Sequence, residues 1–72
     1  MPKRANKVPV STRAIVQRIN RKLAPLDEIL RKSRGEYYVV DITLNCIAHH
    51  DVDLEEFGRE LNALREWEIV DE

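Results

Sequence analysis

The pattern of apolar and polar positions predicts a helix over residues 12–24. Its apolar side chains repeat every four residues, the spacing of one helix face: Ile15, Ile19 and Leu23. Ser11 precedes this stretch and suits the N-cap, because its hydroxyl can accept from free backbone N–H groups of the first turn. Pro25 should end the helix, since proline lacks the N–H that a continuing helix needs.

Aromatic and β-branched residues gather in the stretch Glu36–His50, EYYVVDITLNCIAHH. Such side chains favour strands, and Asn45 tolerates the left-handed backbone of a tight turn. We therefore predict a β-hairpin in which residues 36–43 pair with residues 46–51. Asp41 should not be buried without a partner, so the opposite face of the first strand should pack on the core. That face carries Tyr38, Val40 and Ile42.

The segment 26–33, LDEILRKS, fits two interpretations. We assign residues 28–32 to a strand, because the segment is short and Gly35 closes it just before the hairpin. The alternative is a second helix, since the three apolar residues of the segment also have helical spacing. Residues 12–33 would then resemble a helix–turn–helix pair.

Residues 54–64 show the clearest helical pattern of the chain. The apolar stripe consists of Leu54, Phe57, Leu61 and Leu64. Asp53 suits the N-cap, and Glu56 three residues later completes the spacing of a capping box. Gly58 lies beside the stripe, where a missing side chain would allow another element to approach closely.

The tail, residues 65–72, alternates Trp67 and Ile69 with acidic residues. These two side chains should pack back on the core, and the alternation also allows a short edge strand. Together the elements indicate the α+β class: a small antiparallel sheet of two or three strands with two helices, in the order α-β-β-β-α (alternatively α-α-β-β-α). A single domain would span residues 11–72, after a basic flexible arm over residues 1–10.

Composition narrows the class of protein. The chain has 72 residues, of which 43% are hydrophobic and 35% charged, as expected of a folded domain. A domain this short buries only about 60% of its unfolded surface, so a homodimer or a bound partner would add stability. No apolar run approaches the roughly 20 residues of a membrane span, and MPKRANKVPV lacks the apolar core of a signal peptide. With Cys46 as its one cysteine, the chain is expected to be cytoplasmic and free of the membrane.

Charge divides the chain into two unequal halves. Residues 1–34 hold ten Lys or Arg and two acids, for a net charge of +8, whereas residues 35–72 hold two Arg and eleven acids, for −9. This asymmetry predicts a basic face for a polyanion and an acidic face elsewhere. The alternative is that the two halves fold onto each other, or onto a second copy, and neutralise.

Enzymatic and metal chemistry find little support. On one strand Cys46 and His50 would lie about 13 Å apart at ~3.3 Å per residue, too far to share a zinc ion. The sequence has two glycines, no phosphate-binding glycine loop and no legible Ser–His–Asp arrangement. We therefore expect a protein that is not an enzyme and needs no cofactor or metal.

Nucleic-acid binding, to DNA or RNA, is the leading hypothesis. The predicted phosphate-binding residues are Arg13, Arg18, Arg21, Lys22, Arg31, Lys32 and Arg34. Tyr37 and Tyr38 could stack on bases. The rival hypothesis is a protein-interaction module or inhibitor that presents an acidic, nucleic-acid-like surface to a basic protein. That surface would consist of Glu55, Glu56, Glu60, Glu66 and Glu68.

Two resemblances bear on these hypotheses. The element order α-β-β-β-α is similar to that of double-stranded-RNA-binding domains, whose second helix starts with lysines, whereas residues 53–56 here read Asp-Leu-Glu-Glu. No residue roles are therefore carried over from that family. The segments VSTRAIVQRINRKL, EYYVVD and DVDLEEFGREL resemble short proteins of bacterial plasmids and other mobile elements. That resemblance covers about half the chain and implies a bacterial accessory protein without a particular mechanism.

Overall fold

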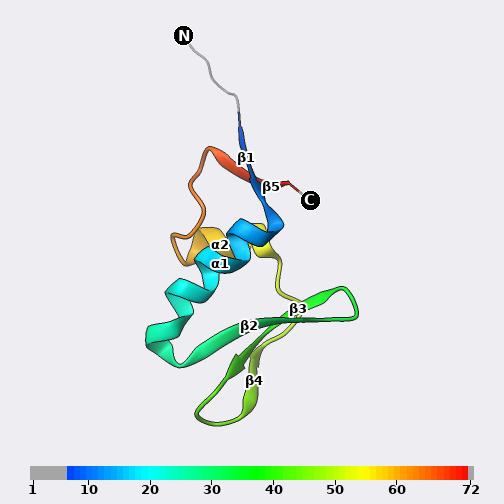
Figure 1. Ribbon diagram of the computed structural model, residues 1–72, viewed down its shortest axis with the longest axis vertical. Coiled ribbons are helices and arrows are strands. Elements are labelled where there is room, and N and C mark those ends of the chain that lie inside the picture. The colour runs from blue at the N-terminus through cyan, green and yellow to red at the C-terminus, as the bar shows by residue number, and fades with distance from the viewer. Residues whose placement is uncertain (1–6, 72) are drawn as a thin grey trace.

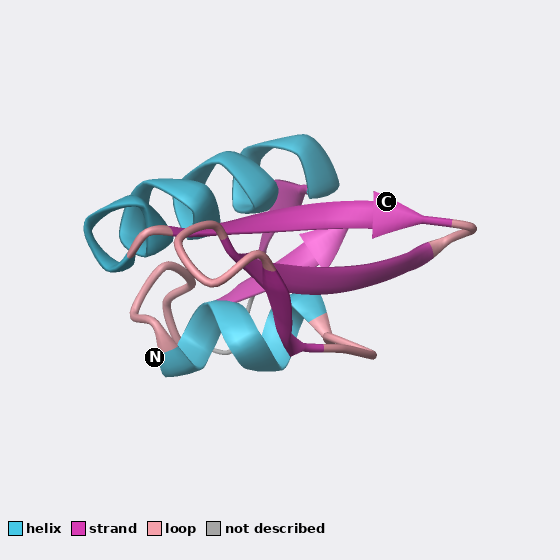
Figure 2. Cartoon of the chain, turned by 90° about the horizontal axis from the view of Figure 1, so that it is seen from below, coloured by secondary structure: helices cyan, strands magenta, loops and turns pink. Residues whose placement is uncertain are grey.

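The computed structural model describes residues 7–71, which form an α+β domain, as predicted (Figure 1). The elements are β1 (Val8–Ser11), α1 (Thr12–Leu23), the 3-10 turn η1 (Ala24–Leu26), β2 (Glu28–Ser33), β3 (Glu36–Asp41), β4 (Cys46–His49), α2 (Leu54–Glu60) and β5 (Glu68–Asp71). Strands β2, β3 and β4 form an antiparallel sheet, and β1 pairs with β5 in parallel. In the view of Figure 2, α1 lies along one side of the molecule and α2 along the other, with strands between them.

Helix α1 begins at Thr12, as predicted, and ends at Leu23, one residue earlier than predicted. The Ser11 hydroxyl accepts a hydrogen bond from the backbone N–H of Ala14 at 3.1 Å, which caps the first turn. Pro25 lies in η1, after which Asp27 adopts a left-handed backbone with φ 57° and turns the chain. The side chains that α1 buries are Ile15, Ile19 and Leu23.

Segment 28–33 is a strand, so the helix–turn–helix alternative is wrong. Asn20 of α1 accepts the backbone N–H of Leu30 through its Oδ1 at 2.7 Å and fixes the start of β2 against the helix. Arg34 and Gly35 then form a two-residue turn with φ 54° and 82°, the left-handed geometry that closes a tight hairpin onto β3. The predicted hairpin of β3 with β4 is also confirmed, with Asn45 at φ 54°, but β3 ends at Asp41 and β4 at His49, both two residues earlier than predicted.

The predicted core face of β3 is wrong. Val39 is fully buried and pairs with buried Leu30, whereas Tyr38, Val40 and Ile42 lie on the opposite side, where Ile42 is 57% exposed. Asp41 shares the face of Val39 without being buried in the core, because it ends the strand and accepts the backbone N–H of Leu44 at 2.9 Å. The argument against burying a carboxylate therefore does not apply to this position.

The basic arm predicted over residues 1–10 is partly wrong. Residues 1–6 lie outside the described residues, but residues 8–10 belong to β1 and pair with β5. The backbone N–H of Val8 donates to the carbonyl of Trp67 at 2.7 Å, and Val10 is buried in the core. The edge strand allowed for in the tail is thus present, and its partner is the other end of the chain.

Helix α2 is shorter than predicted. Asp53 caps it by accepting from the backbone N–H groups of Glu55 and Glu56 at 3.0 and 3.2 Å. The helix ends at Glu60 because Asn62 takes a left-handed backbone with φ 60°. Both Leu61 and Leu64 still reach the core cluster from the loop that follows.

Gly58 is the point where α2 meets α1. A Cβ added there would lie 3.1 Å from Cδ1 of Ile15 and 3.2 Å from Cβ of Leu64, closer than side chains normally pack. The close approach expected of this glycine is therefore confirmed, and no space remains for a branched side chain.

We expect Gly58→Val to lower the free energy of unfolding by about 1–3 kcal/mol, because the added methyl groups overpack the α1–α2 contact. Urea titration would measure the change. The matched control is Glu56→Val, which adds the same side chain to the exposed face of α2 and should cost clearly less. Equal losses in the two variants would show that the Gly58 contact does not limit packing.

Candidate nucleic-acid interface

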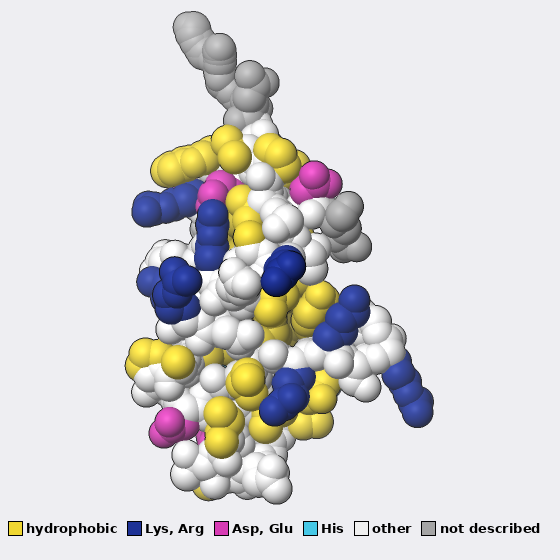
Figure 3. Space-filling view, in the orientation of Figure 1, with side chains coloured by type: hydrophobic (Ala, Val, Ile, Leu, Met, Phe, Trp, Pro, Cys, Tyr) yellow, Lys and Arg dark blue, Asp and Glu magenta, His cyan; other side chains and the backbone are white. Residues whose placement is uncertain are grey.

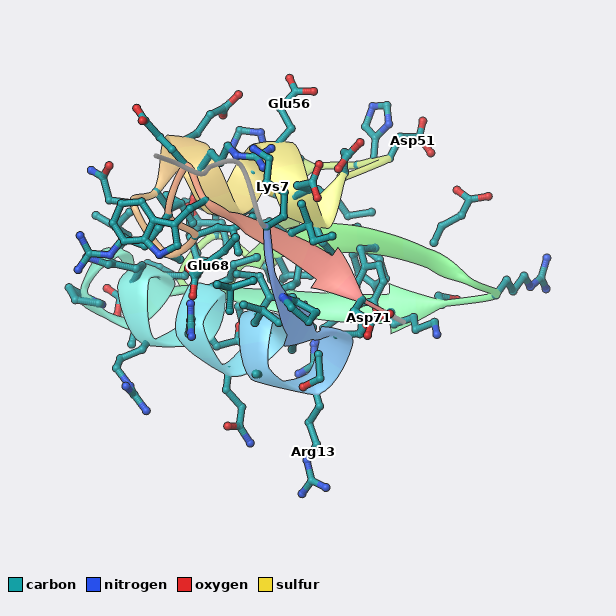
Figure 4. All side chains as sticks on the ribbon, turned by 90° about the horizontal axis from the view of Figure 1, so that it is seen from above. Lys7, Arg13, Asp51, Glu56, Glu68 and Asp71 are labelled. Atoms are coloured by element: carbon teal, nitrogen blue, oxygen red, sulfur yellow. The ribbon has the colours of Figure 1, made fainter. Side chains whose placement is uncertain are left out.

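The two helices present opposite charges to opposite sides of the molecule. In Figure 4, Arg13 points outward from α1 and Glu56 points outward from α2 on the other side. Figure 3 shows Lys and Arg side chains spread over α1 and the β2–β3 hairpin, with few Asp or Glu side chains on that face. Among the described residues, Arg18–Glu68 is the one ion pair that joins the two halves of the sequence. Basic and acidic surfaces therefore remain separate.

Arg18 is engaged inside the fold. Its Nη1 donates to Oε1 of Glu68 at 3.0 Å and to the carbonyl of Ala63 at 3.2 Å. The predicted phosphate ligand thus connects α1 to the chain that leads into β5. Because its guanidinium is bound to Glu68 and to the Ala63 carbonyl, Arg18 supports the basic surface and does not project from it.

Glu68 is the one buried charged residue among those described. Its carboxylate accepts the backbone N–H of Arg65 at 2.8 Å as well as the guanidinium of Arg18, and its carbonyl accepts from Nη2 of Arg59 at 3.0 Å. The Arg65 N–H, followed by Arg18, stabilises the carboxylate and lowers the pKa of Glu68 from its ordinary value of 4.5. Glu68 was predicted to contact an external partner, but it binds Arg18, Arg59 and Arg65 inside the protein, and we call this residue the buried hub.

A groove opens where α1 faces this hub, and we call it the cationic groove. It is lined by Arg18, Arg21, Lys22, Asn62, Ala63, Arg65 and Glu68. Four of these seven residues are cationic, and the single carboxylate is already bound by Arg18 and by a backbone N–H. Arg21 and Lys22 are exposed, as is Arg65. The groove therefore offers a net positive charge and free guanidinium and ammonium donors, which suit phosphate oxygens.

Arg65 is the residue that the sequence did not single out. It lies in the acidic half of the chain, beyond the end of α2, where no periodicity ties it to the cations of α1. The path of the backbone between α2 and β5 brings Arg65 to the groove. The remaining sequence-predicted cations do not line the groove: Arg13, Arg31, Lys32 and Arg34.

The hairpin cations form a separate group. Arg31, Lys32 and Arg34 are exposed on β2 and its turn, and Nζ of Lys32 lies 5.5 Å from the centroid of the Tyr37 ring. That ring packs partly against the core, so the predicted stacking of Tyr37 on a base has little free surface available. These three residues lie on the same basic face as the groove, but they do not line it.

The five glutamates predicted to form one acidic surface lie in different surroundings. Glu55 pairs with Arg59 at 3.3 Å and accepts the backbone N–H of Val70 at 3.1 Å, so it holds α2 to β5. Glu68 is buried. Glu56 and Glu60 remain exposed, and they line a second depression with His49, His50, Asp51, Val52, Asp53 and Phe57, which we call the acidic pocket.

The histidines belong to the rim of this pocket. Nδ1 of His50 lies 3.3 Å from Oδ2 of Asp51, and this hydrogen bond lowers the pKa of Asp51. The His49 ring lies 5.7 Å from that of Phe57. Within residues 7–71, no group of three His, Cys, Asp or Glu could hold a metal ion.

Comparisons with protein-family models, with curated proteins and with solved structures found no match to this chain. The resemblances to mobile-element proteins and to double-stranded-RNA-binding domains therefore stay predictions. Neither helix of the described part is long and apolar enough to cross a membrane. The function is accordingly inferred from the geometry and charge of the groove.

We expect Glu68→Gln to remove an acid-sensitive part of the stability. A carboxylate whose folded pKa is lowered stabilises the fold fully above its unfolded value, near 4.5, and this contribution is lost as the pH falls through the folded value. The amide does not titrate, so the variant should be less stable than the wild type near neutral pH and should converge with it in acid.

Urea unfolding at several pH values down to about pH 3 would measure this convergence. The control is Glu66→Gln, which removes the same charge from an exposed neighbour. If Glu68→Gln and Glu66→Gln behaved alike, the hydrogen bonds to Glu68 would not contribute to stability in the way described.

Proposed function

We propose that this protein is a non-catalytic nucleic-acid-binding protein that holds phosphates in the cationic groove. The observation that supports this most directly is the convergence of Arg21, Lys22 and Arg65 around a carboxylate that is already neutralised. Arg21, Lys22 and Arg65 are exposed cations on two different segments, and together they can contact neighbouring phosphates of one strand.

The fold supports this role because it fixes the groove from both sides. Helix α1 presents Arg21 and Lys22 from its last turn, and the Glu68 hydrogen bonds hold the opposite wall. A preformed groove binds a polyanion without first having to order its own backbone. The acidic α2 lies on the other side of the molecule, so it should orient the protein with its basic face toward the ligand.

Salt dependence of binding is the first test. We expect labelled DNA or RNA to bind with log K falling against log salt at a slope of about −2 to −3, because three phosphate contacts release a matching number of counterions. Fluorescence anisotropy with duplex DNA, single-stranded DNA and duplex RNA would measure it. A slope near zero, or no binding to any of the three at low salt, would contradict the proposal.

Charge removal locates the site. The triple variant Arg21→Gln, Lys22→Gln, Arg65→Gln should lose most of the affinity and most of the salt dependence. The matched control is Arg31→Gln, Lys32→Gln, Arg34→Gln, which removes the same charge from the hairpin and should lose much less. If the hairpin variant lost more affinity than the groove variant, the interface would lie on the β2–β3 hairpin instead.

A second candidate function rests on the acidic pocket. Glu56, Glu60, Asp51 and Asp53 surround the half-buried ring of Phe57, an arrangement that suits a basic segment of a protein partner. Glu56→Lys with Glu60→Lys would abolish such binding and would leave nucleic-acid binding intact.

Light scattering on the same samples would show whether the chain forms the homodimer that its charge asymmetry also allows.

A further inference from the structure

Trp67 is the only tryptophan of the chain, and it is 55% exposed. Tryptophan is highly buried on average, because its ring is the largest apolar surface a side chain can offer. The alternation of the tail predicted that this ring would pack on the core, but the core cluster and its partly buried neighbours do not include it. Core packing therefore does not account for its position.

The backbone that carries this ring is firmly held. The carbonyl of Trp67 accepts the backbone N–H of Val8 at 2.7 Å, and the carbonyl of Glu66 accepts Nζ of Lys7 at 3.1 Å. Glu68, the next residue, is the buried hub. An exposed ring on a fixed backbone can bind a flat ligand at a low cost in conformational entropy.

The ring lines a depression that adjoins the cationic groove. Cζ of Arg65 lies 5.8 Å from the centroid of the Trp67 ring, and the same Arg65 lines the groove. This depression shares Asn62 with the groove as well, and Glu66 also lines it. Figure 3 shows hydrophobic and basic side chains next to each other over the loop that leads into β5. Phosphate-binding and aromatic surfaces are therefore continuous.

We infer that the ligand of this site is a single-stranded nucleic acid, with one base stacked on the Trp67 ring and the adjoining phosphates in the cationic groove. This inference rests on the proposed function. An unpaired base offers its flat face to an aromatic ring, whereas a base inside a duplex offers only its edges. Stacking of this kind tolerates any base, so the groove and the ring together predict binding with little sequence preference.

The test uses the full chain, with Trp67 itself as the fluorophore. An oligothymidylate of about ten nucleotides and a duplex of the same length are titrated at about 50 mM salt. We expect the single strand to quench Trp67 emission and to bind more tightly than the duplex. Trp67→Leu should lower the affinity for labelled single strand roughly tenfold or more, with duplex affinity unchanged, and Trp67→Phe should retain most of the affinity.

The outcomes separate this inference from the proposed function. Equal affinity for the two probes, or wild-type single-strand affinity in Trp67→Leu, would overturn the inference and leave the groove as a phosphate site. No binding of either probe would overturn both. A lower oligomeric state in Trp67→Leu, seen by sedimentation, would mean that a second copy covers the ring and would also contradict the inference. Circular dichroism would confirm that each variant is folded.

Discussion

The hydrogen bonds to the Glu68 carboxylate are the interaction on which the structure around the cationic groove depends. They join Arg18 of α1 to the backbone of Arg65, and the Glu68 carbonyl adds Arg59 of α2. A buried carboxylate without these partners would be costly in free energy. The position of Glu68 at the start of β5 therefore requires both the Arg18 guanidinium and the Arg65 N–H. The same contacts set the distance between α1 and residues 62–65, which are the two walls of the cationic groove.

The local sequence pattern was enough to predict the features that depend on residues close together in the chain. The four-residue repeat of α1 and the caps Ser11 and Asp53 concern short stretches, and all are confirmed. The close approach at Gly58 is also confirmed, although its partner Ile15 lies far away in the sequence. The pairing of β1 with β5 was missed, because it joins residues at opposite ends of the chain. The face of β3 was misassigned because Asp41 lies at the end of a strand that the hairpin pattern extended to residue 43.

The functional surface was less predictable for a related reason. Formal charge identifies the cations of α1, but it does not show that Arg18 and Glu68 neutralise each other inside the fold. Nor does it place Arg65 beside the cations of α1, since Arg65 lies in the net acidic half of the chain. Tertiary contacts therefore remove Arg18 from the predicted basic set and Glu68 from the predicted acidic set. They add Arg65, which lines the cationic groove and lies over the Trp67 ring.

Chemical-shift mapping of backbone amides during addition of an unlabelled oligonucleotide would test the central claim most directly. If the cationic groove is the binding surface, the amides of Arg21, Lys22, Asn62 and Arg65 should shift together and saturate at one protein per site. Amides of α2, on the far side of the molecule, should not move. Shifts confined to α2 or to the Arg34–Gly35 turn, or no shifts at all, would contradict the account.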